Sequence, residues 1–275
     1  MTFAEYTTVD AVRSRYLSSD KDARDEVIHD LIVSTSREIE QICNRKFYPR
    51  TETRYYDTPT LGRVVTLDDD LLDVTAFTNG DGTAFSASQY KAYPLNESVK
   101  TELRVLQSSS AGLLADANGD SDGAINVAGV WGYHNDYASA WVVTAATLTT
   151  SITTTQTTAA VTPSVVKSGT LARIGSECIA VTAVSTSTSA DTLTLTRGVN
   201  GGTAASHTAG DAVLRWDAVV EMVCRMAVAA YFRLRTNPVG ESVTIDGQTF
   251  QTPKDVLQWM DKHLRGMGLI RVGLG

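Results

Sequence analysis

The sequence contains no run of eighteen apolar residues and only three cysteines in 275 residues. An α-helix needs about 20 apolar residues to cross a bilayer, so we expect no membrane-spanning helix. The N-terminal stretch MTFAEYTTVD lacks the basic-then-apolar order of a secretion signal, so we also expect no export. Cys43, Cys178 and Cys224 are far apart and form no CxxC pair, which favours reduced core residues over a metal or redox site.

Basic and aromatic residues are also scarce. Lys and Arg number 24 against 31 Asp and Glu, which gives a net charge of -7, and aromatic residues make up 7% of the chain. Tight binding to nucleic acid normally needs a basic patch, so this composition disfavours it, although an acidic protein can lie beside DNA without gripping it. Residues 144–215 contain no Trp, Tyr or Phe, which argues against sugar binding by stacking.

Familiar catalytic motifs are missing as well. The sequence has no HxH or HExxH motif, and the glycines after Arg197 have no phosphate-loop context. For His207, in a glycine-bounded turn, we expect an imidazole hydrogen bond to the backbone. We therefore predict that the chain is not an enzyme and holds no cofactor. The four isolated histidines are His29, His134, His207 and His263.

The segment from Trp216 to Gly240 has the clearest helical pattern in the sequence. Its apolar residues recur at three- and four-residue steps, as on the buried face of a helix. Asp217 near the start and Arg235 near the end each suit the helix dipole, and Pro238 ends the helix. We therefore expect a buried central helix. The apolar positions are Val219, Val223, Met226, Ala230 and Leu234.

Three further helices are expected. Thr7 or Thr8 can cap the first, over residues 9–18, and a long helix with one apolar face follows over residues 22–44. Residues 242–250 read as a hairpin, because Asp-Gly at its centre favours a type I′ turn. A capping box with proline at the first helical position then predicts a C-terminal helix up to Arg265.

Elsewhere the apolar period is two, which predicts strands. Residues 50–133 read as a meander of short strands, and residues 144–215 as a compact barrel or sandwich, because threonine-rich alternation favours strands over an unfolded linker. We predict an α+β fold with a helical core of long N-terminal, central and C-terminal helices beside a small antiparallel sheet. Residues 1–143 and 216–275 would form this core domain, interrupted by an inserted all-β module at 144–215.

Two acidic stretches invite a metal site. Asp68-Asp69-Asp70 cannot all converge on one ion, because adjacent strand residues point to opposite faces, so we read it as a solvated turn. A second stretch has the alternate spacing of a calcium loop, but Ser121 stands where an EF-hand needs glycine and Val127 where it needs glutamate. A bare polar turn is favoured there, with weak calcium binding as the minority reading. The candidate ligands are Asp116, Asn118, Asp120 and Asp122.

Four segments resemble the head-to-tail connector, or head-completion adaptor, proteins of tailed bacteriophages. They are Ile39–Phe47, Tyr55–Asp57, Ile125–Tyr133 and Arg233–Gly240. In that family the central helix follows the Trp-Gly-Tyr strand after a short loop, whereas about seventy residues intervene here. The intervening residues look like a small β module that recurs in phage structural proteins.

The resemblance implies a structural virion protein at the phage neck, made in the host cytoplasm. Copies of the chain would form a ring, commonly a dodecamer in the family, that binds the portal protein and extends the DNA channel. The ring would dock stopper or tail-completion proteins and let double-stranded DNA pass without sequence-specific binding. The expected contacts with the portal or with neighbouring subunits are Arg233, Arg235, Leu269, Ile270, Arg271 and Val272.

Two alternatives remain open. The chain could be an adhesive or decoration protein of the virion, whose β module binds another capsid component or a host surface glycan. It could instead be a phage-encoded hydrolase, which the missing catalytic motifs disfavour.

Overall fold

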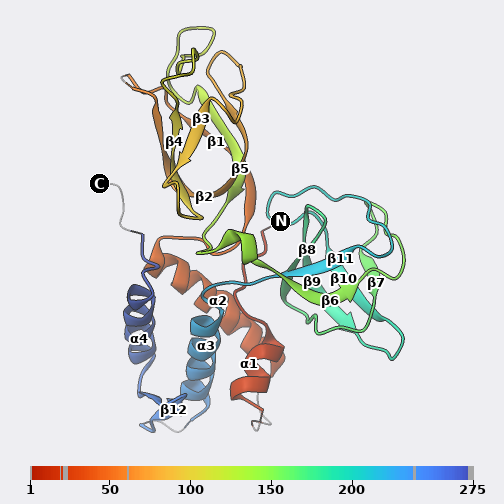
Figure 1. Cartoon of the computed structure of the whole chain (residues 1–275). Coiled ribbons are helices and arrows are strands. Elements are labelled where there is room, and N and C mark those ends of the chain that lie inside the picture. Colours follow the sequence, from red (N-terminus) through yellow and green to blue (C-terminus); the bar gives the residue numbers. More distant parts are fainter. Residues whose placement is uncertain (1, 19, 21–23, 61, 238–239, 272–275) are drawn as a thin grey trace. The chain divides into compact units, whose positions relative to one another are not determined.

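The computed structural model describes residues 2–18, 20, 24–60, 62–237 and 240–271 (Figure 1). The chain divides into two compact units. One unit comprises Met1–Phe47 with Ala140–Gly275, and we call it the helix-and-barrel unit. The other comprises Tyr48–Ser139, and we call it the sheet unit. The strands of the predicted insert therefore group with the helices.

The predicted helical core is wrong, because the described chain is mostly β. Its strands form three sheets of five, six and two strands, beside four α-helices, of which the shortest has eight residues. Each of the two large sheets buries an apolar cluster made of its own residues. The prediction gave the helical stripes too much weight because they are longer, whereas the shorter alternating strands supply most residues of two large buried clusters.

The predicted first, second and last helices are confirmed. Helix α1 spans Val9–Tyr16 and α2 spans Asp25–Cys43, and Thr8 caps α1 by accepting from the Ala11 amide at 3.1 Å. Asn44 ends α2 in the left-handed conformation, with φ of 49°. Helix α4 spans Pro253–Gly266 and begins with the predicted capping box.

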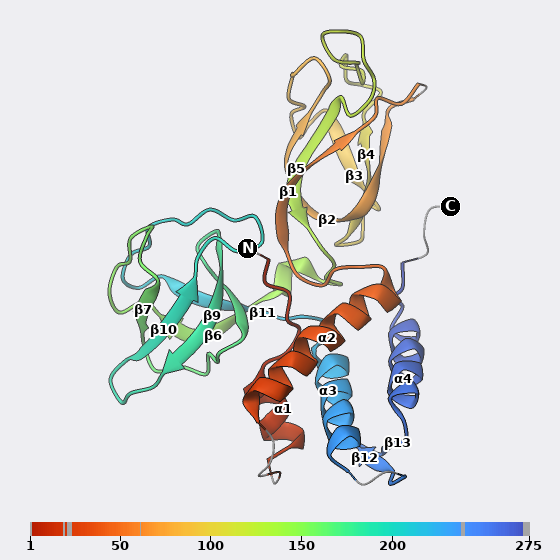
Figure 2. The same cartoon turned by 180° about the vertical axis from the view of Figure 1, so that it is seen from behind.

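The central helix is shorter than predicted. Helix α3 spans Glu221–Thr236 and contacts α1, α2 and α4; in both views it lies between α1 and α4 (Figures 1 and 2). Trp216 belongs to a strand, and its indole N–H donates to the Phe47 carbonyl oxygen at 2.8 Å. Pairing with Trp141 makes Trp216 the last residue of strand β11, and the chain turns at Val219 and Val220 before α3 begins.

The six-stranded sheet closes into a barrel. Its strand order is β6-β11-β8-β9-β10-β7, and Leu148, just after β6, bridges to Val161 of β7. Figure 2 shows the barrel from behind. The chain enters the barrel at Trp141 and leaves it at Trp216, and these two points lie side by side because the two residues pair. The strands are β6 (Trp141–Thr147), β7 (Thr158–Val161), β8 (Thr170–Ile174), β9 (Glu177–Ser185), β10 (Asp191–Thr196) and β11 (Ala212–Trp216).

The sheet unit contains five antiparallel strands in the order β1-β5-β2-β4-β3. Its interior includes the fully buried Trp131. A side chain at Gly129 of β5 would not fit, since its Cβ would lie 2.3 Å from the Asp73 carbonyl oxygen of β2. The strands are β1 (Arg50–Tyr56), β2 (Val64–Thr78), β3 (Tyr90–Tyr93), β4 (Lys100–Val105) and β5 (Ile125–Trp131).

The predicted hairpin is also confirmed. Strands β12 (Val243–Ile245) and β13 (Gln248–Phe250) pair around Asp246 and Gly247, whose φ values are 44° and 78°. Both values are positive, as a type I′ turn requires. None of the helices in the described ranges combines the length and apolar composition needed to cross a membrane.

Candidate functional site

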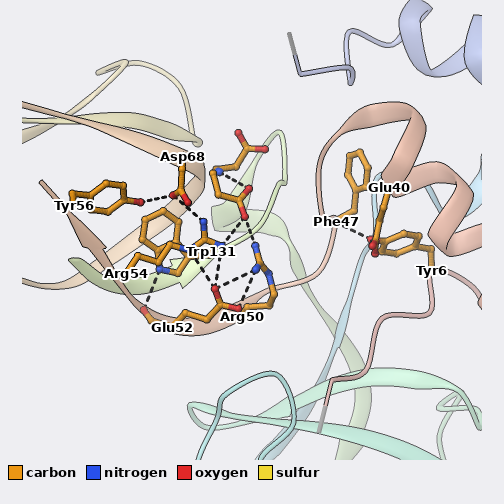
Figure 3. Close-up of polar contacts among 11 residues, drawn as sticks. Tyr6, Glu40, Phe47, Arg50, Glu52, Arg54, Tyr56, Asp68 and Trp131 are labelled. Atoms are coloured by element: carbon orange, nitrogen blue, oxygen red, sulfur yellow. Dashed lines mark hydrogen bonds and ion pairs between the residues drawn. The ribbon is translucent and has the colours of Figure 1, made fainter. Parts of the chain in front are cut away.

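A cluster of charged side chains lies on the sheet unit, between β1 and the middle of β2. Arg50 and Arg54 share one face of β1, because a strand points every second side chain the same way. Arg50 contacts Asp69 at 2.5 Å, and Arg54 contacts Asp69 at 2.9 Å. Arg54 also contacts Asp68 at 2.9 Å (Figure 3). Glu52, between the arginines, pairs with them at 3.0 and 3.1 Å. Both guanidinium groups therefore face carboxylates.

Aromatic side chains complete this cluster. The Tyr56 hydroxyl donates to Asp68 at 2.6 Å, and the Arg54 guanidinium lies 4.5 Å from the centre of the Trp131 ring (Figure 3). Burial alone would raise the pKa of Asp68, but the bonds from Tyr56 and Arg54 outweigh it and lower that pKa. Burial and the bond to Asp68 raise the pKa of Tyr56. At neutral pH the acid is thus ionised and the phenol protonated, so neither is set up to exchange protons.

The cluster ties together two strands that share no backbone ladder. In the sheet, β5 lies between β1 and β2, so the side chains alone connect β1 with the 68–69 segment. The prediction of a solvated turn at Asp68-Asp69-Asp70 is wrong, because all three residues belong to β2 and Asp70 is buried. Sequence reasoning missed the cations that β1 brings to the acids. We assign this cluster a structural role.

A smaller polar network holds the N-terminal segment of the helix-and-barrel unit against the end of α2. The Tyr6 hydroxyl donates to Glu40 at 2.6 Å and accepts from the Phe47 amide at 3.0 Å (Figure 3). Arg37 pairs with the same Glu40 carboxylate at 2.8 Å. Burial, together with the neighbouring Glu40, raises the pKa of Tyr6 well above its usual value. This network also orders structure and offers no reactive group.

One buried carboxylate, Glu177, organises the loops at one end of the barrel. Its side chain is 0% exposed, and Arg197 contacts its two oxygens at 2.7 and 2.6 Å. The Gly198 and Ala205 amides each donate to it at 3.0 Å. His207 Nε2 lies 2.8 Å away and donates, because an ionised carboxylate can only accept. Five donor atoms thus converge on one charge.

Sequence reasoning missed this centre and misread His207. The expected imidazole bond to the backbone is wrong, because the ring bonds Glu177, while the backbone of His207 pairs with Ile152. A signal was present in the sequence: Glu177 is the one carboxylate in the apolar stretch IGSECIAV. Such a residue is almost never buried without a partner. Arg197 was the available cation.

Acid is expected to loosen the barrel. Burial alone would raise the pKa of Glu177, but the bonds from Arg197, Ala205, His207 and Gly198 lower it from 4.5 to about 2. Because the folded-state pKa is the lower one, the stabilisation is complete above pH 4.5 and is lost as the pH falls toward 2. Urea unfolding between pH 6 and pH 2, followed by the fluorescence of Trp141 and Trp216, should show stability falling below about pH 4.5. A flat profile in that window would contradict the prediction.

The predicted calcium ligands lie in a loop of the sheet unit. The Asp116 carboxylate accepts from the amides of Asn118 and Asp120 at 2.8 Å each, as in a polar turn that closes on itself. Asp120 and Asp122 are exposed. Within the described ranges, no three His, Cys, Asp or Glu side chains are grouped as metal ligands would be. Calcium binding here stays a prediction.

The predicted interface residues fall into different environments. Arg233 donates to the Tyr16 carbonyl oxygen at 2.6 Å, so it serves its own chain. Leu269 is only 3% exposed, Ile270 is half-buried, and the Arg271 amide donates to the Cys43 carbonyl oxygen at 2.8 Å. Val272 lies outside the described residues. Arg235 is exposed in the last turn of α3. Of the described members of the set, Arg235 is therefore best placed to meet a partner.

Arg235 lies at a groove between α2 and α3, which we call the α2–α3 groove. The groove has a volume of about 360 Å³. Its apolar lining comes from Leu31, Tyr231 and Leu234, with Pro253 at the start of α4. The Tyr231 hydroxyl donates to Glu38 at 2.9 Å and ties the two helices together. The lining also includes Ser34, Glu38 and Arg235.

Sequence reasoning identified Arg235 but not the groove. Leu31 and Leu234 were assigned to buried helix faces, and both are half-exposed. Only the packing of α2 against α3 brings the two faces together.

Comparison of the chain with protein-family models, with curated proteins and with solved structures finds no match.

Proposed function

We propose that this chain is a head-to-tail adaptor of a tailed bacteriophage. Copies of it would form a ring that binds the portal protein, extends the DNA channel and docks stopper or tail proteins in the virion neck. The four segments that resemble the family support the proposal. Several of their residues have structural roles: Asn44 caps α2, and Phe47 and Trp131 are buried. The prediction of a helical core was wrong, and the proposed function does not depend on it.

The observation that carries the proposal is the α2–α3 groove. An open apolar groove with a charged rim suits a segment of another protein chain, because apolar contact supplies affinity and the charge supplies specificity. A subunit that forms rings by head-to-tail contacts needs such a surface. Assembly would therefore be the function of this part of the chain.

The charge balance suits a DNA channel. The chain carries a net charge of -7. A conduit with acidic walls repels phosphate and lets DNA slide, whereas basic walls would hold it by counterion release. The passing double-stranded DNA would thus be neither bound tightly nor read.

Electron microscopy of the chain mixed with purified portal particles tests the proposal. We expect a ring of extra density on one end of the portal, which is absent from portal particles alone. Portal particles that carry no added density at any ratio of the two proteins would overturn the proposed function.

A further inference from the structure

The α2–α3 groove places a specific demand on whatever fills it. Arg235 is exposed, and it makes no ion pair within the part of the chain that the structure describes. Its neighbours Leu234 and Tyr231 are apolar and half-exposed. A guanidinium beside an apolar floor suits a segment that carries an apolar side chain and, close to it, a carboxylate.

The sheet unit carries such a segment in the 94–97 loop between β3 and β4. Leu95 is 52% exposed, although it is a large aliphatic side chain. Glu97, two residues later, is exposed and makes no ion pair among the described residues. The loop thus presents an apolar side chain that matches the groove floor and a carboxylate that matches Arg235.

This loop is also held in shape before any partner arrives. The Lys100 ammonium donates to the carbonyl oxygens of Pro94 at 2.7 Å, of Leu95 at 3.4 Å and of Glu97. Three bonds from one cation fix the backbone while the Leu95 side chain faces solvent. Binding by such a loop loses little conformational entropy, which favours affinity.

Size and competition also favour this loop. An apolar cavity of about 150 Å³ already takes a molecule the size of benzene, so the groove, at about 360 Å³, has room for a leucine side chain and its neighbours. Among the described loop residues of the sheet unit, Leu114 is the other exposed aliphatic residue beside an acid. Its neighbour Asp116 is occupied by the amides of Asn118 and Asp120, whereas Glu97 is available.

We propose that Leu95 of one copy enters the α2–α3 groove of the next copy, with Glu97 against Arg235. The 94–97 loop and the α2–α3 groove are different patches of the chain, so the contact is heterologous. Such a contact builds a ring or an open helical filament of subunits, not a twofold dimer. The inference rests on the proposed function, because it names the contact by which ring subunits would recognise one another.

Two charge reversals, used separately and then together, test the contact. Arg235→Glu reverses the charge at the groove and leaves the loop unchanged, whereas Glu97→Arg reverses the charge on the loop and leaves the groove unchanged. We expect each variant alone to lower the yield of rings on portal particles about ten-fold or more, because like charges then meet at every contact. Both residues are exposed, so both variants should keep the melting temperature of the unchanged chain.

Mixing the two variants in equal amounts should restore ring assembly. In an alternating ring every contact again joins opposite charges. At one contact the glutamate introduced in the groove meets the arginine introduced in the loop, and at the next the unchanged Arg235 meets the unchanged Glu97. An interaction within a single copy could not be rescued in this way.

Two further variants complete the test. Arg24→Glu, at another exposed arginine, serves as the control and should leave the yield of rings unchanged. Leu95→Ser should reduce the yield without affecting the melting temperature, because it removes the apolar side chain that would fill the groove.

The outcomes separate the contact from the function. Normal rings from either single reversal, or no rescue in the mixture, would overturn the contact while the adaptor ring stands. Failure of the unchanged chain to form rings on the portal would overturn the proposed function itself. Loss with each variant and recovery in the mixture would establish the contact.

Discussion

Replacing Glu177 by glutamine is expected to lower the free energy of unfolding of the barrel by about 3–5 kcal/mol. All the groups around this side chain are donors: Arg197, His207 and the amides of Gly198 and Ala205. The glutamine amide would place its own N–H groups against some of them. Arg197 would also keep a positive charge that is almost fully buried, without its counter-ion. Both effects act in the same direction.

Urea unfolding followed by tryptophan fluorescence measures this loss, because Trp141 and Trp216 lie on the barrel strands β6 and β11. Glu241→Gln is the matched control, since Glu241 is exposed and the chemical change is identical. We expect the control to shift stability by no more than about 0.5 kcal/mol. A loss below about 1 kcal/mol in Glu177→Gln would show that the barrel does not depend on the buried charge.

Replacing Gly129 by alanine is expected to destabilise the sheet unit by about 3 kcal/mol. The added Cβ would lie 2.3 Å from the Asp73 carbonyl oxygen and 2.7 Å from Leu71 Cδ1. Strand β2 shifts its register against β5 at this point, which brings the Asp73 backbone over Gly129. Backbone cannot move aside as a flexible side chain can, so the strands must separate locally.

Urea unfolding followed by tryptophan fluorescence measures this loss. Trp131 is fully buried in the sheet unit and lies two residues from Gly129 on the same strand. Gly112→Ala is the control, since a Cβ there would meet nothing within 4 Å. We expect the control to remain within about 0.5 kcal/mol of the unchanged chain. Equal stabilities for the two alanine variants would contradict the prediction, because they would mean that β2 and β5 can separate at Gly129 at no cost in free energy.

Local patterns in the sequence determined most helix and turn positions. The Thr8 cap, the left-handed Asn44, the Asp246-Gly247 turn and the capping box before α4 depend on residues within a few positions of one another. Short-range hydrogen bonds and backbone preferences decide such features, so a sequence contains them in full. The start of α3 was misplaced because Trp216 ends strand β11 and residues 217–220 form the connection to the helix, which an apolar pattern alone does not distinguish from a first helical turn.

The tertiary structure alone decided the rest. That the strands, not the helices, form most of the fold depends on which residues each sheet buries. Asp69 meets Arg50 from 19 positions away, and Glu177 meets His207 from 30. The α2–α3 groove joins Leu31 to Leu234 and Pro253. Pairing across such separations depends on strand register and helix packing, which sequence period does not encode. The sequence by itself therefore specified Arg235 as a charge at a helix end, and only the packing of α2 against α3 placed it beside an apolar groove.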